Sequence, residues 1–268
     1  MISMRDFDSY DVCSQTSTVY LLLNNPQYAG RIIVIVEGDD DKTVYKEFFV
    51  EDTVLLHPDG NCDKHEIILN DLNPQYYKRL IAIKDADFDR LNSVVQKFRN
   101  LFISDTHDLE GMVLRDGIPT NLSDSDSYRC ANVDVYIIKE SLRDISLLKW
   151  YNNINSCGLN FRDVDVNIPI VDYWHRVVAN TASSVSVTYE HFQRFVEDVL
   201  TVDLDELTNG HDLFERVYLQ AKSADKSNFP KKQFFKRLRS TYTLERFKNT
   251  SLYASLVAWP FLEGKVLE

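Results

Sequence analysis

The sequence predicts an α/β fold: a parallel sheet flanked by helices, with a mainly helical C-terminal region. In the first 125 or so residues, short apolar runs alternate with segments of helical spacing, which is typical of a parallel sheet covered by helices. After the polar stretch at residues 121–127, helical patterns replace the apolar runs. We therefore expect two regions, residues 1–125 and residues 126–268.

Four apolar runs are expected to form the sheet. The first, residues 32–36, is a continuous β-branched run of the kind that is buried on both faces of a sheet. Residues 54–56, 80–83 and 101–103 are the other three expected strands. Apolar side chains recur at helical spacing over residues 44–49, and a second helix, around residues 67–72, is expected to end at Pro74.

The second region is expected to be mainly helical. One short segment, residues 159–161, has the pattern of a possible strand. The helical patterns cover residues 135–150, 189–200, 212–221, 231–239 and 244–259.

Charge is distributed unevenly along the chain. The net charge is −11, which taken alone argues against a nucleic-acid partner. The basic segment, residues 222–248, contains nine Lys or Arg and two acidic residues, a net charge of +7 that leaves −18 for the rest. An acidic body with one basic segment suits a protein that binds a divalent metal in one place and phosphates in another.

Several classes of protein are not expected. No apolar run approaches the roughly 20 residues of a membrane span, and the first nine residues lack the apolar stretch of a signal peptide. The four cysteines are scattered without metal-like spacing, which favours reduced thiols and a cytoplasmic location. Walker, Rossmann and HExxH motifs are absent.

Carboxylates follow three of the four expected strands. Residues 37–41 read EGDDD after the first strand, residues 85–89 read DADFD after the third, and residues 105–110 read DTHDLE after the fourth. In open α/β sheets the carboxyl ends of the strands form the ligand crevice. We therefore expect the three clusters to meet at one edge of the sheet.

The acidic clusters predict a site for Mg²⁺ or Mn²⁺. Asp85 and Asp87 face the same way if the segment is extended, so both can hold one ion, and hard oxygen ligands favour these metals over zinc. Glu37 leaves a buried strand, which favours a functional role. Asp39 and Asp40 suit helix capping, whereas Asp41 suits either use.

The remaining acids leave alternatives open. Asp105 and Glu110 suit a metal site or a structural role equally, and His107 and Asp108 suit the positioning of a turn. An EF-hand around residues 85–96 fails, because Arg90 stands where that loop requires glycine.

The strings IVIVEGDDD at residues 33–41 and IKDADFD at residues 83–89 closely resemble the Toprim domain of topoisomerases, primases and OLD-family nucleases. The resemblance covers about residues 30 to 115. With residues 105–110 and Gly210-His211-Asp212, the chain looks like a stand-alone, OLD-like Toprim nuclease family that includes the effector subunit of the PARIS anti-phage system. The resemblance implies a Toprim-like parallel sheet.

The resemblance also implies roles for individual residues. Glu37, Asp85 and Asp87 would be catalytic, Glu37 as a general acid/base or metal ligand and the two aspartates as metal ligands. Asp41, Asp105 and Glu110 would help to bind a second ion, so that one ion activates water and the other steadies the leaving oxygen of a phosphodiester.

The implied activity is a Mg²⁺-dependent endonuclease acting on DNA or RNA, with tRNA as one candidate substrate. The implied biological role is a toxic effector in antiviral defence, held in check by an ABC-type ATPase partner and active as a homodimer. The chain has no nucleotide-binding motif, so the ATPase would act in trans. Topoisomerase and primase activities are not expected, because the large extra domains that they require are missing.

The basic segment is the candidate nucleic-acid interface. A helix is expected after Pro230, with Phe234, Phe235 and Leu238 facing the core. Its solvent side would track phosphates, or would simply be a solvated helix face. The residues assigned to nucleic-acid binding are Lys231, Lys232, Lys236, Arg237 and Arg239.

Two other hypotheses compete with the nuclease. The chain could be a non-catalytic Toprim module that serves as a scaffold in an ATPase complex. It could also be a dehalogenase-type phosphatase, which likewise places a DxD after a strand. That family, however, has Thr or Val where this chain has Asp89.

Overall fold

Four short parallel strands form one sheet in the order β2-β1-β3-β4 in the computed structural model, which describes residues 12–57, 63–181, 187–199, 201–224 and 229–267. In register, Ile33 of β1 lies opposite Val54 of β2 and Leu80 of β3, and Ala82 of β3 lies opposite Leu101 of β4. The strands are β1 (Ile33–Ile35), β2 (Val54–Leu56), β3 (Leu80–Lys84) and β4 (Leu101–Ile103).

The chain divides into two compact units. The first unit, which contains the sheet, comprises Met1–Asp85, Val95–Asp105 and Tyr242–Glu268; the second comprises Ala86–Val94 and Thr106–Thr241. The helices of the first unit are α1 (Val12–Asn24), η2 (Pro26–Tyr28), α2 (Asp39–Tyr45), η3 (Lys46–Phe48), α3 (Asp63–Tyr76), α12 (Leu244–Lys248) and α13 (Ser251–Val257).

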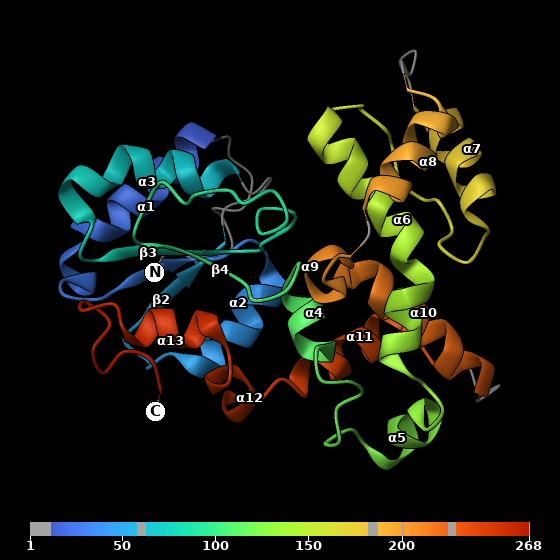
Figure 1. Cartoon of the computed structure of the whole chain (residues 1–268). Coiled ribbons are helices and arrows are strands. Elements are labelled where there is room, and N and C mark those ends of the chain that lie inside the picture. The colour runs from blue at the N-terminus through green and yellow to red at the C-terminus, as the bar shows by residue number, and fades with distance from the viewer. Residues whose placement is uncertain (1–11, 58–62, 182–186, 200, 225–228, 268) are drawn as a thin grey trace. The chain divides into compact units, whose positions relative to one another are not determined.

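The sheet is buried on both faces, as its continuous apolar strands require. On one face lie α1 and α3. The core on this face joins alternate strand residues, such as Ile33, Ile35 and Leu80, to Ile68 and Leu69 of α3. On the other face lie α2 and α13 (Figure 1). There Phe48 stacks on Phe247 at 4.5 Å between ring centroids, and the Phe102 ring contacts Trp259 edge-on.

The second unit is helical within its described residues. The long helix α6 packs against α7, α8, α9 and α10, and α10 also contacts α4, α5 and α11. Its helices are α4 (Leu109–Leu114), α5 (Asp124–Cys130), α6 (Val135–Asn155), α7 (Ile170–Asn180), α8 (Tyr189–Asp198), α9 (Leu204–Leu207), α10 (Gly210–Ala224) and α11 (Lys231–Ser240). No described helix in either unit is both long enough and apolar enough to cross a membrane.

The predicted α/β class is confirmed: a four-stranded parallel sheet flanked by helices and a helical C-terminal region. Three details differ. Pro74 lies inside α3 instead of ending it, and residues 159–161 form no strand. The helix predicted over residues 244–259 is two helices, because the side chain of Thr250 accepts a hydrogen bond from Tyr253 N and so begins α13 afresh.

The two units also differ from the expected regions 1–125 and 126–268. Residues 242–268 belong to the sheet unit, since α13 packs on β4 and α12 packs on η3. Residues 86–94 and 106–125 belong to the helical unit. Both units are therefore discontinuous in sequence.

A buried ion-pair network holds α11 to α5 in the second unit. The Asp126 side chain is only 1% exposed, and it binds Arg129 at 3.0 Å and Arg237 at 2.5 Å between nitrogen and oxygen. Burial alone raises the pKa of Asp126, but the hydrogen bonds from Arg237 and Arg129 outweigh burial and hold this pKa below its usual value.

We expect the Asp126→Asn variant to be less stable than wild type by about 1–3 kcal/mol at neutral pH, allowing for the partial exposure of Arg237. A carboxyl whose pKa is lowered by folding stabilises the folded state at pH values above its unfolded pKa of about 3.9. This contribution is lost as the pH falls through the folded-state pKa. Urea unfolding should therefore show the difference shrinking in acid. Asp124→Asn, an exposed change in the same helix, is the matched control, and equal midpoints for the two variants would contradict the role of the network.

Candidate functional site

The acidic residues that follow β1 and β3 are joined by a hydrogen bond in the first unit. Glu37 follows the buried strand β1, and its Oε1 accepts a hydrogen bond from the backbone N–H of Asp85 at 3.0 Å. Asp85 directly follows β3, the parallel neighbour of β1. Two acidic clusters that lie far apart in the sequence thus meet at the carboxyl edge of the sheet.

Asp41 lies in the first turn of α2, close to the end of β1. Gly38 is the N-cap of this helix, and a Cβ added to it would lie 3.2 Å from Oδ2 of Asp41. Asp39, in the same turn, instead binds Nε2 of His57 at 2.8 Å and is largely exposed. Asp39 and Asp41 therefore differ, and the Asp41 carboxylate lies close to Gly38.

Asp105 follows β4 and holds the start of α13. Its two carboxylate oxygens accept hydrogen bonds from the backbone N–H groups of Ser251 at 2.7 Å and Leu252 at 2.8 Å. A carboxylate at a helix N-terminus satisfies free N–H groups and is favoured by the helix dipole. A structural use of Asp105 is thus in place, and its use as a metal ligand stays a prediction.

Tyr45 is a residue of this region that the sequence analysis did not identify. It is 1% exposed, and its hydroxyl has no hydrogen-bond partner among the described residues. Burial raises its pKa well above the usual value, and the charges of Asp41, Asp85 and Asp105 raise it further. A buried, unsatisfied donor thus lies within electrostatic reach of a carboxylate from each of three different segments. Its position four residues after Asp41 in a helix was the available signal.

Asp87 belongs to the second unit and departs from the extended conformation expected of it. Its φ is 44°, in the left-handed region that aspartate tolerates, and its N–H donates to the carbonyl of His107 at 2.7 Å. The segment is therefore not extended at Asp87, although the prediction that Asp85 and Asp87 share one ion assumed an extended segment. Metal binding by Asp87 stays a prediction.

Asp108 positions a turn, as one of the two sequence interpretations had it. It caps α4 by accepting from Gly111 N at 2.8 Å, and its other oxygen accepts from Gly210 N at 2.7 Å. Burial alone raises the pKa of Asp108, but the His107 imidazole and these N–H groups outweigh it and lower the pKa. A Cβ on Gly210 would lie 2.6 Å from the Gly111 nitrogen, so this position has no room for a side chain.

Glu110 forms an internal ion pair with Arg239, whose Nε lies 3.0 Å from Oε1. Burial and the neighbouring Asp108 raise the pKa of Glu110, and Arg239 only partly offsets the rise. The predicted metal ligand Glu110 and the predicted phosphate ligand Arg239 thus bind each other. Either role would require this pair to open.

The basic helix α11 has its predicted orientation, with Phe234, Phe235 and Leu238 buried. Two more of its cations have carboxylate partners: Arg237 binds Asp126, and Lys231 binds Glu215 at 2.8 Å. Lys232 and Lys236 are exposed. Among the described residues neither forms an ion pair, so these two are best placed for phosphates. Of the wider basic segment, residues 225–228 lie outside the described part.

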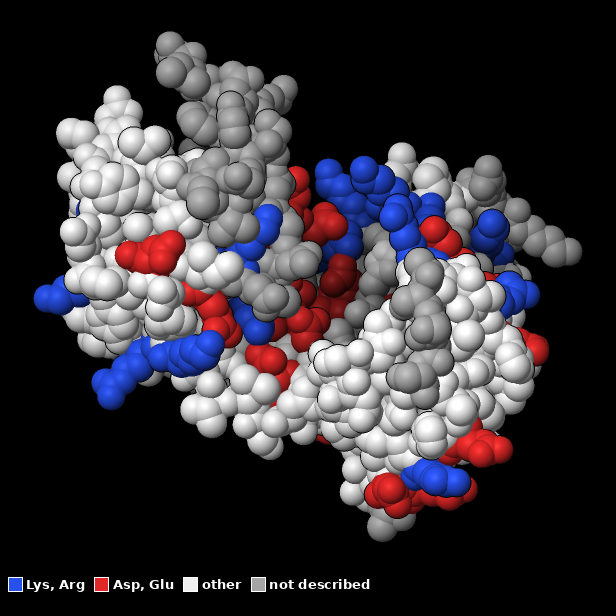
Figure 2. All heavy atoms as spheres, turned by 90° about the horizontal axis from the view of Figure 1, so that it is seen from above, with Lys and Arg blue, Asp and Glu red and all other residues white. Residues whose placement is uncertain are grey.

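Charged side chains of the same sign gather in groups on the face shown in Figure 2. Carboxylate oxygens are suitable donors for Mg²⁺ or Mn²⁺. Within the described residues, however, no three His, Cys, Asp or Glu side chains are already grouped as an ion site. The described thiols, Cys130 and Cys157, are free.

Comparisons with protein-family models, with curated proteins and with solved structures find no match for this chain. Its function must therefore be argued from its own residues and geometry.

The Tyr45→Phe variant keeps the ring and removes the unsatisfied hydroxyl. Because a buried donor without a partner is costly, we expect equal or slightly higher stability, by up to about 1 kcal/mol, without added metal. The control is Tyr218→Phe, whose lost hydroxyl donates to the buried carbonyl of Phe229 at 3.1 Å. That change should cost about 1–2 kcal/mol in urea unfolding. A loss of stability in Tyr45→Phe equal to that of the control would show that the Tyr45 hydroxyl has a partner.

Proposed function

We propose that this chain is a metal-dependent endonuclease of the stand-alone, OLD-like Toprim type, using Mg²⁺ or Mn²⁺ to cut phosphodiester bonds in DNA or RNA. One observation carries the proposal: the Glu37 carboxylate at the end of β1 is held by the first aspartate of the DADFD cluster at the end of β3. A glutamate and an aspartate pair on neighbouring parallel strands are what the Toprim resemblance requires. The Toprim assignment itself is part of the proposal.

The chain's own residues would bind and orient the reactants. Glu37, Asp41 and Asp85 supply negative oxygens at the carboxyl edge of the sheet, and Asp87 and Glu110 are further candidate ligands. A bound divalent ion would supply charge stabilisation for the phosphate and lower the pKa of the attacking water. The Tyr45 hydroxyl is a donor without a partner that could orient a water molecule or a carboxylate when an ion is bound. Lys232 and Lys236 would attract phosphates electrostatically, and added salt would shorten the range of this attraction.

The Glu37→Gln variant is the sharpest test, because the glutamine side-chain oxygen can still accept the Asp85 N–H while the negative charge is lost. We expect the wild-type chain to cleave supercoiled plasmid or a tRNA pool with Mg²⁺ or Mn²⁺ and to stop when EDTA is added. Glu37→Gln should reduce the rate on the order of 10²-fold or more with an unchanged urea midpoint. Glu47→Gln, the same change at an exposed glutamate of the first unit, should leave the rate unchanged.

Two outcomes would contradict different parts of the proposal. A folded wild-type chain that cleaves neither substrate with either ion would favour a non-catalytic Toprim scaffold. Cleavage by Glu37→Gln at the wild-type rate would keep the nuclease but remove Glu37 from its site. An acyl-phosphate trapped on Asp85 would favour the phosphatase.

The nuclease is proposed to be a toxic effector of anti-phage defence, restrained by an ABC-type ATPase and dimeric when released. A nuclease that reads no evident base sequence would damage its own host, so its activity requires restraint. We expect co-expression with an ABC-type ATPase encoded beside it to give a stable complex on affinity purification. Analytical ultracentrifugation of the chain alone should show a dimer. A monomer that binds no ATPase and is harmless at high expression would contradict this account of control.

A further inference from the structure

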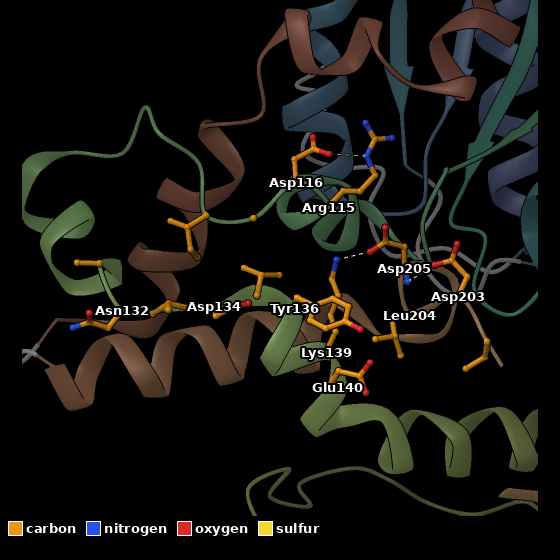
Figure 3. Close-up of a pocket in the computed structure, with 16 residues that line it drawn as sticks. Arg115, Asp116, Asn132, Asp134, Tyr136, Lys139, Glu140, Asp203, Leu204 and Asp205 are labelled. Carbon is orange, nitrogen blue, oxygen red and sulfur yellow. Dashed lines mark hydrogen bonds and ion pairs between the residues drawn. The ribbon is translucent and has the colours of Figure 1, made fainter. Parts of the chain in front are cut away.

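An open cavity of about 880 Å³ lies within the second unit, apart from the acidic residues at the end of the sheet. It is formed by the segment after α4, the start of α6 with the loop before it, and the residues that lead into α9 (Figure 3). This volume is in the range of ligand sites in proteins. No residue of the predicted nuclease site lines the cavity.

The lining carries an excess of negative charge. Its carboxylates are Asp116, Asp134, Glu140, Asp203 and Asp205, and its cations are Arg115 and Lys139. Both cations already have carboxylate partners, because Arg115 binds Asp116 at 3.4 Å and Lys139 binds Asp205. Figure 3 shows both pairs as dashed lines.

Three carboxylates of the lining form no ion pair with any described residue. Asp134 caps α6 by accepting from Ile137 N at 3.1 Å, and Asp203 caps the start of α9 by accepting from Asp205 N at 2.8 Å. Glu140 accepts from the Tyr136 hydroxyl, which raises the pKa of Tyr136. With five carboxylates and two cations in the lining, an excess charge of about −3 faces the cavity.

Apolar surface lies beside these charges. Tyr136 is 66% exposed in the lining, and Ile137 next to it on α6 is 62% exposed. Val133 and Val202 also line the cavity and are only half-buried. A ligand that filled this site would therefore present both cations and apolar groups to the lining.

The floor of the cavity is already fixed in place. Lys139 is buried on the inward side of α6, and its ion pair with Asp205 ties α6 to α9. The carbonyl of Asp205 also accepts the His107 N–H at 2.9 Å. A preformed site loses little free energy to ordering when a ligand binds.

We infer that this cavity binds a short, extended basic segment of another protein. Arginine or lysine side chains would pair with Asp134, Glu140 and Asp203, and intervening apolar residues would cover Val133 and Val202. An arginine over the exposed Tyr136 ring would add a cation–π contact. A polyamine would satisfy the carboxylates but leave the apolar surface uncovered, so the lining favours a peptide. The inference does not depend on the nuclease activity.

The probe is a fluorescein-labelled peptide of alternating arginine and valine, about nine residues long and so roughly 30 Å when extended. Fluorescence anisotropy with the full chain should show saturable binding that weakens as salt is added. The same peptide with citrulline in place of arginine, which keeps the shape and removes the charge, should bind at least about tenfold more weakly.

The test variant combines three changes, Asp134→Asn, Glu140→Gln and Asp203→Asn. Asparagine at the first and third positions can still cap the two helices. We expect it to weaken peptide binding at least about tenfold, and Tyr136→Ser to weaken it as well. The control is Asp163→Asn with Asp172→Asn and Glu190→Gln, which makes the same charge change at exposed positions of this unit away from the cavity. It should bind the peptide as wild type does.

Three results would overturn the inference. One is the absence of saturable binding by the arginine peptide. Another is equal loss of binding in the test and control variants, which would show attraction to net charge alone. The third is saturable binding of spermidine at this cavity with none of the peptide, which would make the occupant a small polyamine.

Discussion

The hydrogen bond from the Asp85 backbone to the Glu37 carboxylate is the interaction on which the proposed chemistry depends. It forms because β1 and β3 are parallel neighbours, so the residue after each strand emerges at the same edge. Both strands are wholly buried, and all their residues except Lys84 are apolar. The acidic residues after them are placed where they can face a ligand. The position of Glu37 is therefore set by sheet pairing and by a backbone donor, both of which survive changes in the side chains around it.

The acids after β4 show how structural and chemical uses of a carboxylate compete. Asp105 binds the first turn of α13, and Asp108 caps α4 and holds Gly210. Glu110 binds Arg239. In each case the carboxylate satisfies groups of its own unit, and a metal ion would have to replace or share those contacts. Glu37 instead contacts the backbone of Asp85 at the carboxyl edge of the sheet, and Asp41 lies close to the end of β1, which is why these two carry more of the proposal.

The sequence was most informative where burial dictates residue type. Runs of apolar β-branched residues located the sheet, and the period of Phe234, Phe235 and Leu238 located the buried side of α11. It was less informative where tertiary contacts decide the outcome. Proline normally ends a helix, but Pro74 lies two residues before the end of α3, where few hydrogen bonds remain to be lost. The helix α7 was not anticipated.

The candidate site was only partly predictable for the same reason. The strand ends placed Glu37 and Asp85 at one edge, but the turn at Asp87 depends on a carbonyl from His107, which lies far along the chain. The partners of Arg237 and Arg239 are likewise distant carboxylates, so a solvent-facing basic helix could not be distinguished from an internally paired one. Tyr45 looked like an ordinary core residue, because its spacing could indicate only Asp41, and Asp85 and Asp105 come near it through the fold.

The discontinuous division of the chain has a consequence for its synthesis on the ribosome. The sheet unit includes residues 242–268, which supply the Phe247 and Trp259 rings that cover Phe48 and Phe102. Until residues 242–268 emerge, one face of the sheet has α2 but lacks the cover that α13 and these rings supply, although all four strands have already been made. The helical unit needs nothing beyond Thr241 and can be completed earlier. The Phe48 and Phe102 rings therefore stay partly uncovered until residues 242–268 have been made, and the unit that holds Glu37 and Asp85 is completed after the helical unit.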